Sequence, residues 1–556
     1  MSSHPERRRA PTWLRLVPYV VVARLLVAVV ARSAVSRPED DAVVVDEPVE
    51  ALLPVVTFEE AAQLGLELDF GPNCDPSTGR VRLPLAEAPP CVALDPRVPP
   101  PPTTGGVVRI AVYQTRVNPA MQGMIGPLGA GLGGPELERA VQDYSAIFES
   151  VTQMWGRSVE FIGLPASGLP TDPVAARNDA IRAAEDLGAF AVLGGPVQTT
   201  VFAEELAARD VVCLGCATAP SVELTESLAP DVITPAMAPE QLAAHVGEFI
   251  VEQLAGQPAS QAGPELADQQ RAFGLIAPQR SGDAAEQTGS IERELTDQGV
   301  DLVASVSYQV DPATAATQAA TNVLRLADAG VTSVIVAADP ISLGPITKAA
   351  TDQGWFPEWI ITGALLSDNT FLSRTYDQTQ WAHAFGVTTR VVPSGSPADS
   401  SGTDLYDWYY GGPPPVDGLV VNTLVSGLTT LYAVLALTGP ELTPATLRDG
   451  LFRIDVPSGG PTQASVAFGR DVWPYDDYYG VDDATVIRWD PGARTVDELG
   501  REGVGAYRFV DGGERHLPGT WPSEPYRPGP DDPVRLPENP VVVPTYPPPP
   551  GAPTAD

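Results

Sequence analysis

The sequence predicts an α/β protein with two lobes, each a doubly wound parallel sheet, joined by a hinge. Short runs rich in β-branched residues alternate with amphipathic helical patterns between residues 107 and 389, and this alternation requires parallel sheets covered on both faces. A long helical pattern over residues 239–255 ends one series, and a second series begins at Arg271. The 556 residues are enough for two or three folded units at roughly 100 to 200 residues each.

Residues 1–36 differ from the rest of the chain. Arg7, Arg8 and Arg9 precede an apolar run over residues 16–31, which Arg24 interrupts. This pattern is typical of an export signal. The run is short for a membrane span of about 20 residues, so we favour a signal cleaved near residues 31–34, with an uncleaved anchor as the alternative. We therefore expect an extracytoplasmic protein, secreted or at the cell surface, that contacts a membrane only through its N-terminus.

The charge of the chain excludes one class of partner. It contains 34 Lys and Arg against 70 Asp and Glu, which gives a formal net charge of -36. Such a surface repels nucleic-acid phosphates and anionic lipid headgroups. We expect no nucleic-acid partner.

Residues 37–106 are rich in proline and acidic side chains and predict an irregular extension followed by a stiff polyproline spacer. Export places the four cysteines in an oxidising compartment, where we expect two local disulfides. A pairing of Cys74 with Cys91 would close a loop of about 18 residues and stabilise the fold by roughly 3 kcal/mol.

Lobe 1 is expected to begin at residues 107–238. The run VVRIAVYQT predicts its first strand, and further strands are predicted at residues 158–164, 189–195 and 211–215. The helix that follows Asp172 has a capping side chain at that position, proline at its first turn and Gly188 at its end.

Lobe 2 is expected at residues 239–392, with strands at residues 272–277, 301–308, 332–338, 359–364 and 384–389. The apolar segment 416–439 is long enough to cross a membrane, but Asn and Thr side chains interrupt it. We interpret it as a buried helix, so residues 393–456 return to lobe 1. Residues 457–521 are predicted to form a C-terminal crossover and extension, and residues 522–556 a disordered, Pro-rich tail.

Cys213 and Cys216 form a C-x-x-C motif. A thioredoxin-like motif opens a helix, whereas Pro220 follows here within a few residues. A metal site would need two more ligands. We therefore expect a structural disulfide that rigidifies the loop, with free thiols as the alternative.

Other motifs give no catalytic or metal centre. GAGLGG at residues 129–134 lies too far beyond the first strand for a dinucleotide site. The four histidines occupy neither a G-x-S-x-G nor an H-E-x-x-H context. The acidic aromatic run 473–491 lacks the spacing of a calcium loop and predicts a solvated, aromatic-packed turn. We expect no cofactor, no metal and no enzymatic activity.

The segment AVLGGPVQTTVFAEELAARDVVCLGCATAPSVELT resembles the first-lobe signature of type I periplasmic solute-binding proteins, the group that includes the Leu/Ile/Val receptors of ABC importers. The order of elements over residues 107–490 is similar too. Residues 37–106 resemble the N-terminal extension of large surface-displayed members.

The resemblance implies a ligand site on the loops after the third and fourth strands of lobe 1. These loops supply hydroxyls and backbone N–H groups to a ligand carboxylate, and the matching positions are Gln198, Thr199, Thr200, Cys216, Ala217 and Thr218. Short polar side chains beside helix N-termini suit an anion.

In lobe 2 the resemblance places an aromatic residue and a carboxylate beside a ligand ammonium. The aromatic position matches Asp339 or Pro340, and the carboxylate position falls among Gly363, Ala364 and Leu365, which carry no charge. An α-amino-acid ligand is therefore disfavoured. Asp339 either binds a ligand group or caps the next helix.

These observations favour an extracytoplasmic binding protein that encloses a small polar organic ligand for an ABC importer and its permease. A two-lobed enzyme of glycosyltransferase type is the alternative, but it would need basic residues for a nucleotide diphosphate. A surface sensory or structural protein that kept the fold without a ligand is the third hypothesis.

Overall fold

The structure is a computed structural model. It describes residues 54–99, 102–103, 105–116, 135–196, 199–216, 220–279, 286–364, 366–395, 401–416, 418–454, 459–538 and 542–554. The predicted export signal at residues 1–36 and the GAGLGG motif at residues 129–134 lie outside this part of the chain.

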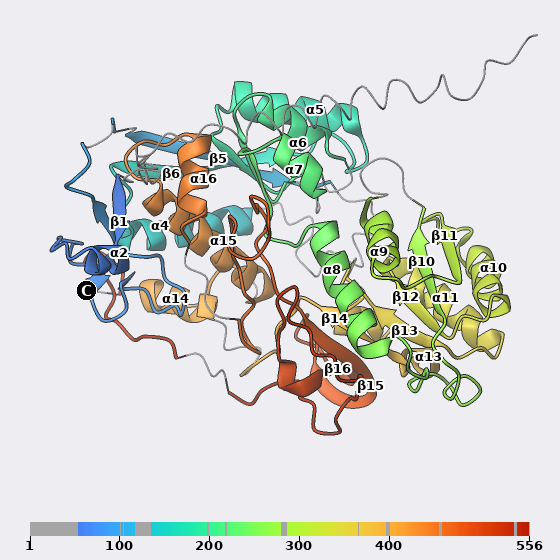
Figure 1. Cartoon of the computed structure of the whole chain (residues 1–556). Coiled ribbons are helices and arrows are strands. Elements are labelled where there is room, and N and C mark those ends of the chain that lie inside the picture. The colour runs from blue at the N-terminus through green and yellow to red at the C-terminus, as the bar shows by residue number, and fades with distance from the viewer. Residues whose placement is uncertain are drawn as a thin grey trace, which may run out of the picture. The chain divides into compact units, whose positions relative to one another are not determined.

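Lobe 1 contains a parallel five-stranded sheet in the order β6-β5-β7-β8-β9 (Figure 1). Alternate strand residues face opposite sides, so Ile110 packs with helices α4 and α15 while Ala111 packs with α5 and α6. The strands are β5 (Gly106–Gln114), β6 (Arg157–Pro165), β7 (Ala191–Leu193), β8 (Val212–Leu214) and β9 (Val232–Ile233). The helices are α4 (Pro135–Val151), α5 (Pro173–Ile181) with its continuation η3 (Arg182–Asp186), α6 (Val201–Ala207), α7 (Val222–Ser227), α14 (Ser401–Tyr410), α15 (Gly418–Leu437) and α16 (Pro444–Leu451).

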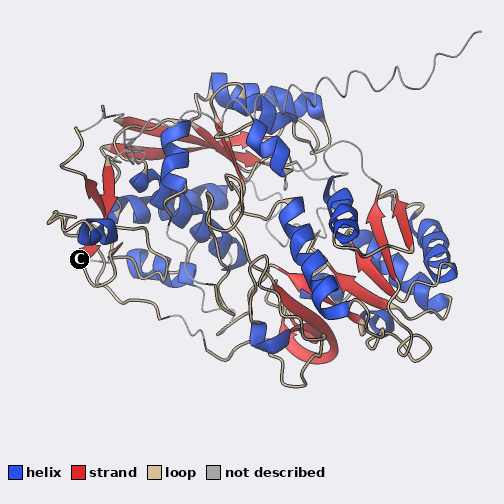
Figure 2. Ribbon diagram, viewed as in Figure 1, coloured by secondary structure: helices blue, strands red, loops and turns tan. Residues whose placement is uncertain are grey.

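Lobe 2 contains a seven-stranded sheet in the order β11-β10-β12-β13-β14-β15-β16. Figure 2 shows its strands in red with blue helices packed beside them. The strands β10 to β14 are parallel, and β15 and β16 add to one edge in antiparallel orientation. Strand bounds are β10 (Phe273–Pro278), β11 (Ala304–Tyr308), β12 (Ser333–Val336), β13 (Glu358–Ile361), β14 (Ala384–Thr388), β15 (Thr485–Val496) and β16 (Glu502–Phe509). The helices are α8 (Pro239–Phe249) with η4 (Ile250–Leu254), α9 (Glu286–Asp297), α10 (Ala315–Asp328), α11 (Pro340–Asp352), α12 (Thr370–Ser373) and α13 (Gln378–Trp381), and the short helix η6 (Val510–Gly513) follows β16.

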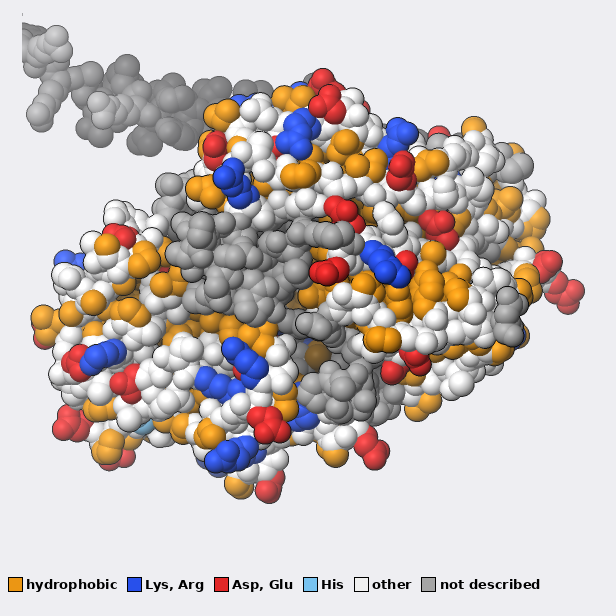
Figure 3. Space-filling model, turned by 180° about the vertical axis from the view of Figure 1, so that it is seen from behind, with side chains coloured by type: hydrophobic (Ala, Val, Ile, Leu, Met, Phe, Trp, Pro, Cys, Tyr) orange, Lys and Arg blue, Asp and Glu red, His pale blue; other side chains and the backbone are white. Residues whose placement is uncertain are grey.

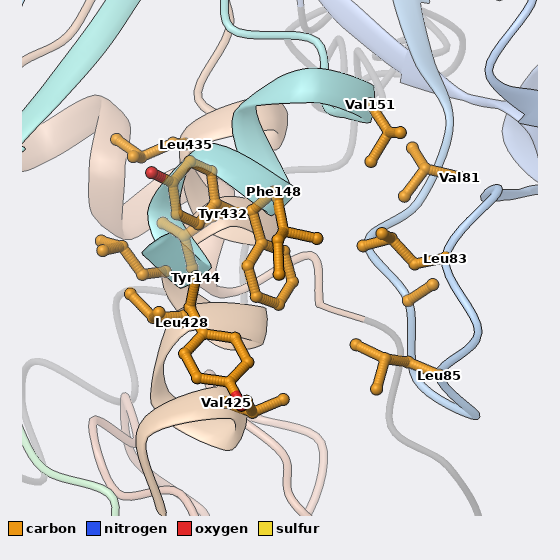
Figure 4. Close-up of a cluster of buried hydrophobic side chains, with 14 of the residues drawn as sticks. Val81, Leu83, Leu85, Tyr144, Phe148, Val151, Val425, Leu428, Tyr432 and Leu435 are labelled. Atoms are coloured by element: carbon orange, nitrogen blue, oxygen red, sulfur yellow. The ribbon is translucent and has the colours of Figure 1, made fainter. Parts of the chain in front are cut away.

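The apolar helix α15 is part of the lobe 1 core. By its length and composition, the segment Val420–Leu437 could cross a membrane, but 59% of this segment is buried inside the protein. Tyr432 stacks on Phe148 of α4 with ring centroids 5.2 Å apart, and Leu435 is fully buried beside them (Figure 4). The interpretation as a buried lobe helix is confirmed.

The N-terminal extension packs into lobe 1. Its short strands are β1 (Val55–Thr57), β2 (Cys74–Asp75), β3 (Arg80–Val81) and β4 (Val92–Leu94), with helix α2 (Phe58–Gln63) after β1. Val81, Leu83 and Leu85 belong to the same core cluster as α4 and α15 (Figure 4). A disulfide joins Cys74 to Cys91, as expected.

The C-terminal region differs from the expectation. Strands β15 and β16 were not predicted, and the expected disordered tail is wrong for residues 522–538 and 542–554. Tyr526 stacks on Phe385 with centroids 4.5 Å apart, Trp408 Nε1 donates to the carbonyl oxygen of Tyr546 (2.8 Å), and Ala552 is buried. Proline prevents secondary structure in this tail, but its spaced aromatic and small apolar side chains still bury surface against both lobes.

Replacing both Cys74 and Cys91 by alanine should lower the free energy of unfolding by about 3 kcal/mol, because the disulfide closes a loop with a sequence separation of 17. Denaturant titration of the purified protein measures this change. A reductant should shrink the difference, since the wild-type protein then loses the same cross-link. Equal stability of both proteins under oxidising conditions would contradict the prediction.

Candidate functional site

The carboxyl ends of the parallel strands of lobe 1 place two loops in backbone contact. β7 pairs with β8 up to Leu193 and Leu214, and the N–H of Gly194 donates to the carbonyl oxygen of Leu214 (3.1 Å). A Cβ atom on Gly195 would lie 2.2 Å from the carbonyl oxygen of Cys216. Only glycine permits this approach.

The C-x-x-C motif closes the second of these loops. Cys213 and Cys216 form a disulfide, and both are fully buried in the core between the sheet and helices α5 and α6. Gly215 between them has φ +66 and donates its N–H to the carbonyl oxygen of Ile233 (2.7 Å). The predicted disulfide is confirmed in place of free thiols. Because its sulfur is occupied, Cys216 can offer a ligand only backbone groups.

Thr199 and Thr200 precede helix α6, after the loop that follows β7. The N–H of Val201 donates to Oγ1 of Thr199 (3.3 Å), and Oγ1 of Thr200 donates to Oε1 of Glu204 (2.7 Å). Both threonines are half-buried. Gln198, Ala217 and Thr218 lie outside the described residues, so their roles remain predictions.

In lobe 2, Asp339 caps helix α11, as the alternative interpretation expected. Its Oδ1 accepts hydrogen bonds from the N–H groups of Ile341 and Ser342 (both 3.1 Å), and its Oδ2 accepts one from the hydroxyl of Tyr308 (2.8 Å). Burial, together with the adjacent carboxylate, raises the pKa of Tyr308, so this phenol stays protonated and keeps donating. Oδ2 retains one further lone pair.

The loops after β13 and β14 form a second polar cluster, which the sequence analysis missed. Thr388 Oγ1 donates to Oδ2 of the buried Asp368 (2.6 Å), Arg390 donates to Asn369 Oδ1 (2.9 Å), and the same guanidinium pairs with Glu498 (3.0 Å). The only sequence signal is the group SDN shortly after a strand. The partners on β14 and on the loop after β15 come from distant positions.

The acidic aromatic segment is buried, so the expectation of a solvated turn is wrong. Asp477, Asp482 and Asp483 are each at most 2% exposed. Gln241 and His245 of helix α8 and the ring of Trp473 cover this segment. The expected aromatic packing is present, but it encloses the carboxyl groups.

The described residues contain no group of three or more His, Cys, Asp and Glu side chains placed to hold a metal ion. On the face drawn in Figure 3, acidic and basic side chains are interspersed over the surface. The described residues on this face thus form no concentrated basic patch for a polyanion.

Two α/β lobes, with short polar loops at the carboxyl ends of their parallel strands, are the architecture of the two-lobed binding proteins found in periplasmic transport. A family model described as periplasmic binding protein matches residues 123–482. The chain belongs to this family, and its fold is that of the type I members.

Several solved structures are similar to this chain at low sequence identity. An ABC-transporter solute-binding protein from Rhodopseudomonas palustris in complex with 4-hydroxybenzoate is 13% identical, with a TM-score of 0.49 over 72% of this chain and 96% of that one. A Leu-, Ile-, Val-, Thr- and Ala-binding protein from Brucella ovis is 14% identical, with a TM-score of 0.48 over 77% and 97%. A substrate-binding protein from Sphaerobacter thermophilus is 16% identical, with a TM-score of 0.49 over 75% and 100%. The comparison with curated proteins gives no match.

Gly195→Ala should lower the free energy of unfolding by about 1 to 3 kcal/mol, because the new methyl group forces the two loops apart. Denaturant titration measures the loss. Gly344→Ala is the matched control: its Cβ would meet nothing within 4 Å and it lies inside helix α11, so stability should stay equal or rise by up to about 1 kcal/mol. An unperturbed Gly195→Ala protein would show that the contact between the loops is not tight.

Proposed function

We propose that this solute-binding protein captures a small polar organic ligand between its two lobes and delivers it to the permease of an ABC importer. The observation that carries the proposal is the contact between the loops after β7 and β8, where Gly195 meets the carbonyl group of Cys216. This contact fixes two short polar loops at one edge of the lobe 1 sheet. Small ligands of open α/β sheets bind at that edge.

The lobe 1 half of the proposed site consists of hydroxyl, amide and backbone groups. It includes the side chain of Thr199, the backbone groups of Thr200 and Cys216, and Gln198, Ala217 and Thr218 from the family resemblance. The hydroxyl of Thr199, the side-chain amide of Gln198 and backbone N–H groups suit a carboxylate or another small anion, since they donate hydrogen bonds without adding charge. The hydroxyl of Thr200 donates to Glu204, so Thr200 would contribute through its backbone.

The lobe 2 half is proposed to include Asp339, which would accept a hydrogen bond from a ligand hydroxyl through the free lone pair of Oδ2. Its other lone pairs serve the helix cap and Tyr308, so it is a poor sole partner for an ammonium group. Gly363 and Ala364 after β13 add no charge. A ligand with a carboxylate and hydroxyl groups fits better than an α-amino acid.

Binding rather than catalysis is proposed as the use of this site. A ligand that contacts both lobes binds the closed arrangement better than the open one and so shifts the population toward closure. Membership of the periplasmic family implies an extracytoplasmic location, and the two disulfides suit an oxidising compartment. Attachment through the N-terminal segment belongs to the proposal.

Native mass spectrometry of the protein purified from its own host tests the function directly. We expect a retained small molecule that is released on denaturation and that raises the melting temperature when added back. If no molecule is retained and no compound of a broad metabolite panel raises the melting temperature, the receptor function is wrong.

Thr218→Ala should weaken binding of the retained molecule by about 1 to 3 kcal/mol, because a ligand group would lose a buried hydrogen-bond partner. Isothermal titration calorimetry measures the affinity. Thr321→Ala is the control, since this exposed threonine of α10 bonds only to its own helix at Thr317, and it should leave the affinity unchanged. An unchanged affinity of Thr218→Ala would remove this residue from the site.

A further inference from the structure

Two connections between the lobes run side by side. Residues 234–238 lead from β9 of lobe 1 to α8 of lobe 2, and residues 465–484 lead from the lobe 1 core, which includes Phe468 and Tyr478, to β15. The N–H of Thr234 donates to the carbonyl oxygen of Tyr478 (3.0 Å), and Thr234 forms a parallel bridge with Tyr479. Any hinge motion of the lobes must pass through these segments.

Two buried carboxyl groups lie in the second connection. Asp482 accepts hydrogen bonds through both oxygens, from the N–H of Ala467 (2.5 Å) and from Trp473 Nε1 (3.0 Å). Oδ1 of Asp477 accepts two, from Gln241 Nε2 and the N–H of Tyr479 (both 3.0 Å). Gln241 belongs to α8, so this contact joins the second connection to the first helix of lobe 2.

Oδ2 of Asp477 is buried without a donor from any other residue, although the two carboxyl side chains lie in hydrogen-bonding contact with each other. Two carboxylates that touch cannot both carry a negative charge away from water. One proton, carried by Asp482 and donated to Oδ2 of Asp477, removes both difficulties. It satisfies the orphaned oxygen and leaves a single charge.

The neighbouring charged groups do not supply this missing proton. Nδ1 of His245 accepts from Trp521 Nε1 (3.0 Å), so Nε2 carries the ring proton and donates it to the carbonyl oxygen of Asp482 (2.9 Å). Burial lowers the pKa of His245 to about 4 and keeps it neutral. Arg515 pairs with Asp483 (2.7 Å). The other titratable groups around the pair include Glu240, Tyr475, Tyr479 and His516.

We propose that Asp477 and Asp482 share one proton inside the second connection, which Gln241 joins to helix α8, and that loss of this proton loosens the hinge. The hinge role rests on the proposed function, in which the lobes open and close around a ligand. The shared proton itself rests only on the contacts above.

The pH window follows from burial. Desolvation raises the pKa of Asp477 to about 6 and that of Asp482 to about 8, and both values belong to the pair because the proton is shared. A pKa raised in the folded state stabilises the fold at low pH, and this contribution is lost as the pH rises through the folded value. The unfolding equilibrium constant should therefore rise by up to about tenfold per pH unit between about pH 6 and 8.

The variant Asp477→Asn distinguishes the contribution of this pair to the pH dependence of stability from that of the other titrating groups. The amide nitrogen takes the place of Oδ2 and donates to Asp482 at any pH, while Oδ1 keeps its two donors. The variant should lose the pair's share of the pH dependence that denaturant titrations of the wild-type protein show between pH 6 and 8.5. Asp476→Asn, which alters the neighbouring surface pair with Arg470, should retain it. Equal pH dependence in wild type and Asp477→Asn would overturn the shared proton.

The hinge role needs a second readout, taken on the same proteins without ligand. Small-angle scattering should show a wider molecule at pH 8.5 than at pH 6 for the wild-type protein and for Asp476→Asn, and no change for Asp477→Asn. Unchanged scattering of the wild-type protein would overturn the hinge role. Neither experiment uses a ligand, so failure here is distinct from failure to find a retained molecule.

Infrared spectroscopy keeps the proposal testable if Asp477→Asn fails to fold. The wild-type protein at pH 6 should show the carbonyl band of a protonated carboxyl group, which disappears by pH 9. Absence of this band at pH 6 would overturn the shared proton.

Discussion

The need of parallel strands for crossover connections governs this molecule. Each crossover places a helix on one face of a sheet, so both sheets are buried on both sides and the carboxyl ends of the strands that crossovers join meet at one edge. The polar loops of lobe 1 lie at that edge because they directly follow the strands β7 and β8. The chain also passes between the lobes in packed, partly buried segments, where polar groups must find partners inside the protein.

The strands predicted between residues 107 and 389 are all present in the structure, because β-branched runs between helical patterns leave little choice of element. The hairpin of β15 and β16 was missed because a register shift between Asp490 and Arg494, with Pro491 and Gly492 inside the strand, breaks its alternation. β9 has two residues and gives no periodic signal. The tail was missed because its order comes from partners such as Trp408, far away in sequence.

The features of the candidate site were also predictable from the sequence only where they depend on neighbouring residues. The disulfide of Cys213 and Cys216 could be predicted from the sequence, because a C-x-x-C motif that no helix follows is expected to form a structural disulfide in an oxidising compartment. The cap formed by Asp339 was also accessible, since proline follows it. The buried state of Asp477 was not, because its covering partner Gln241 lies 236 positions away. The acidic and aromatic composition of this segment alone predicts that it is solvated. Its burial depends on packing against residues that are far away in the sequence.

Two buried carboxylates of lobe 2 are paired with arginine. Arg271 forms two hydrogen bonds to Glu358 in the interior, and Arg374 pairs with Asp497. Arginine keeps its charge at every physiological pH, so these pairs hold their arrangement as the pH changes. In the second connection, by contrast, each of the two carboxyl groups has the other carboxyl group as its partner. These two pairs of lobe 2 thus keep their charges as the pH changes, whereas a single proton sets the charge of the proposed pair at the junction between the lobes.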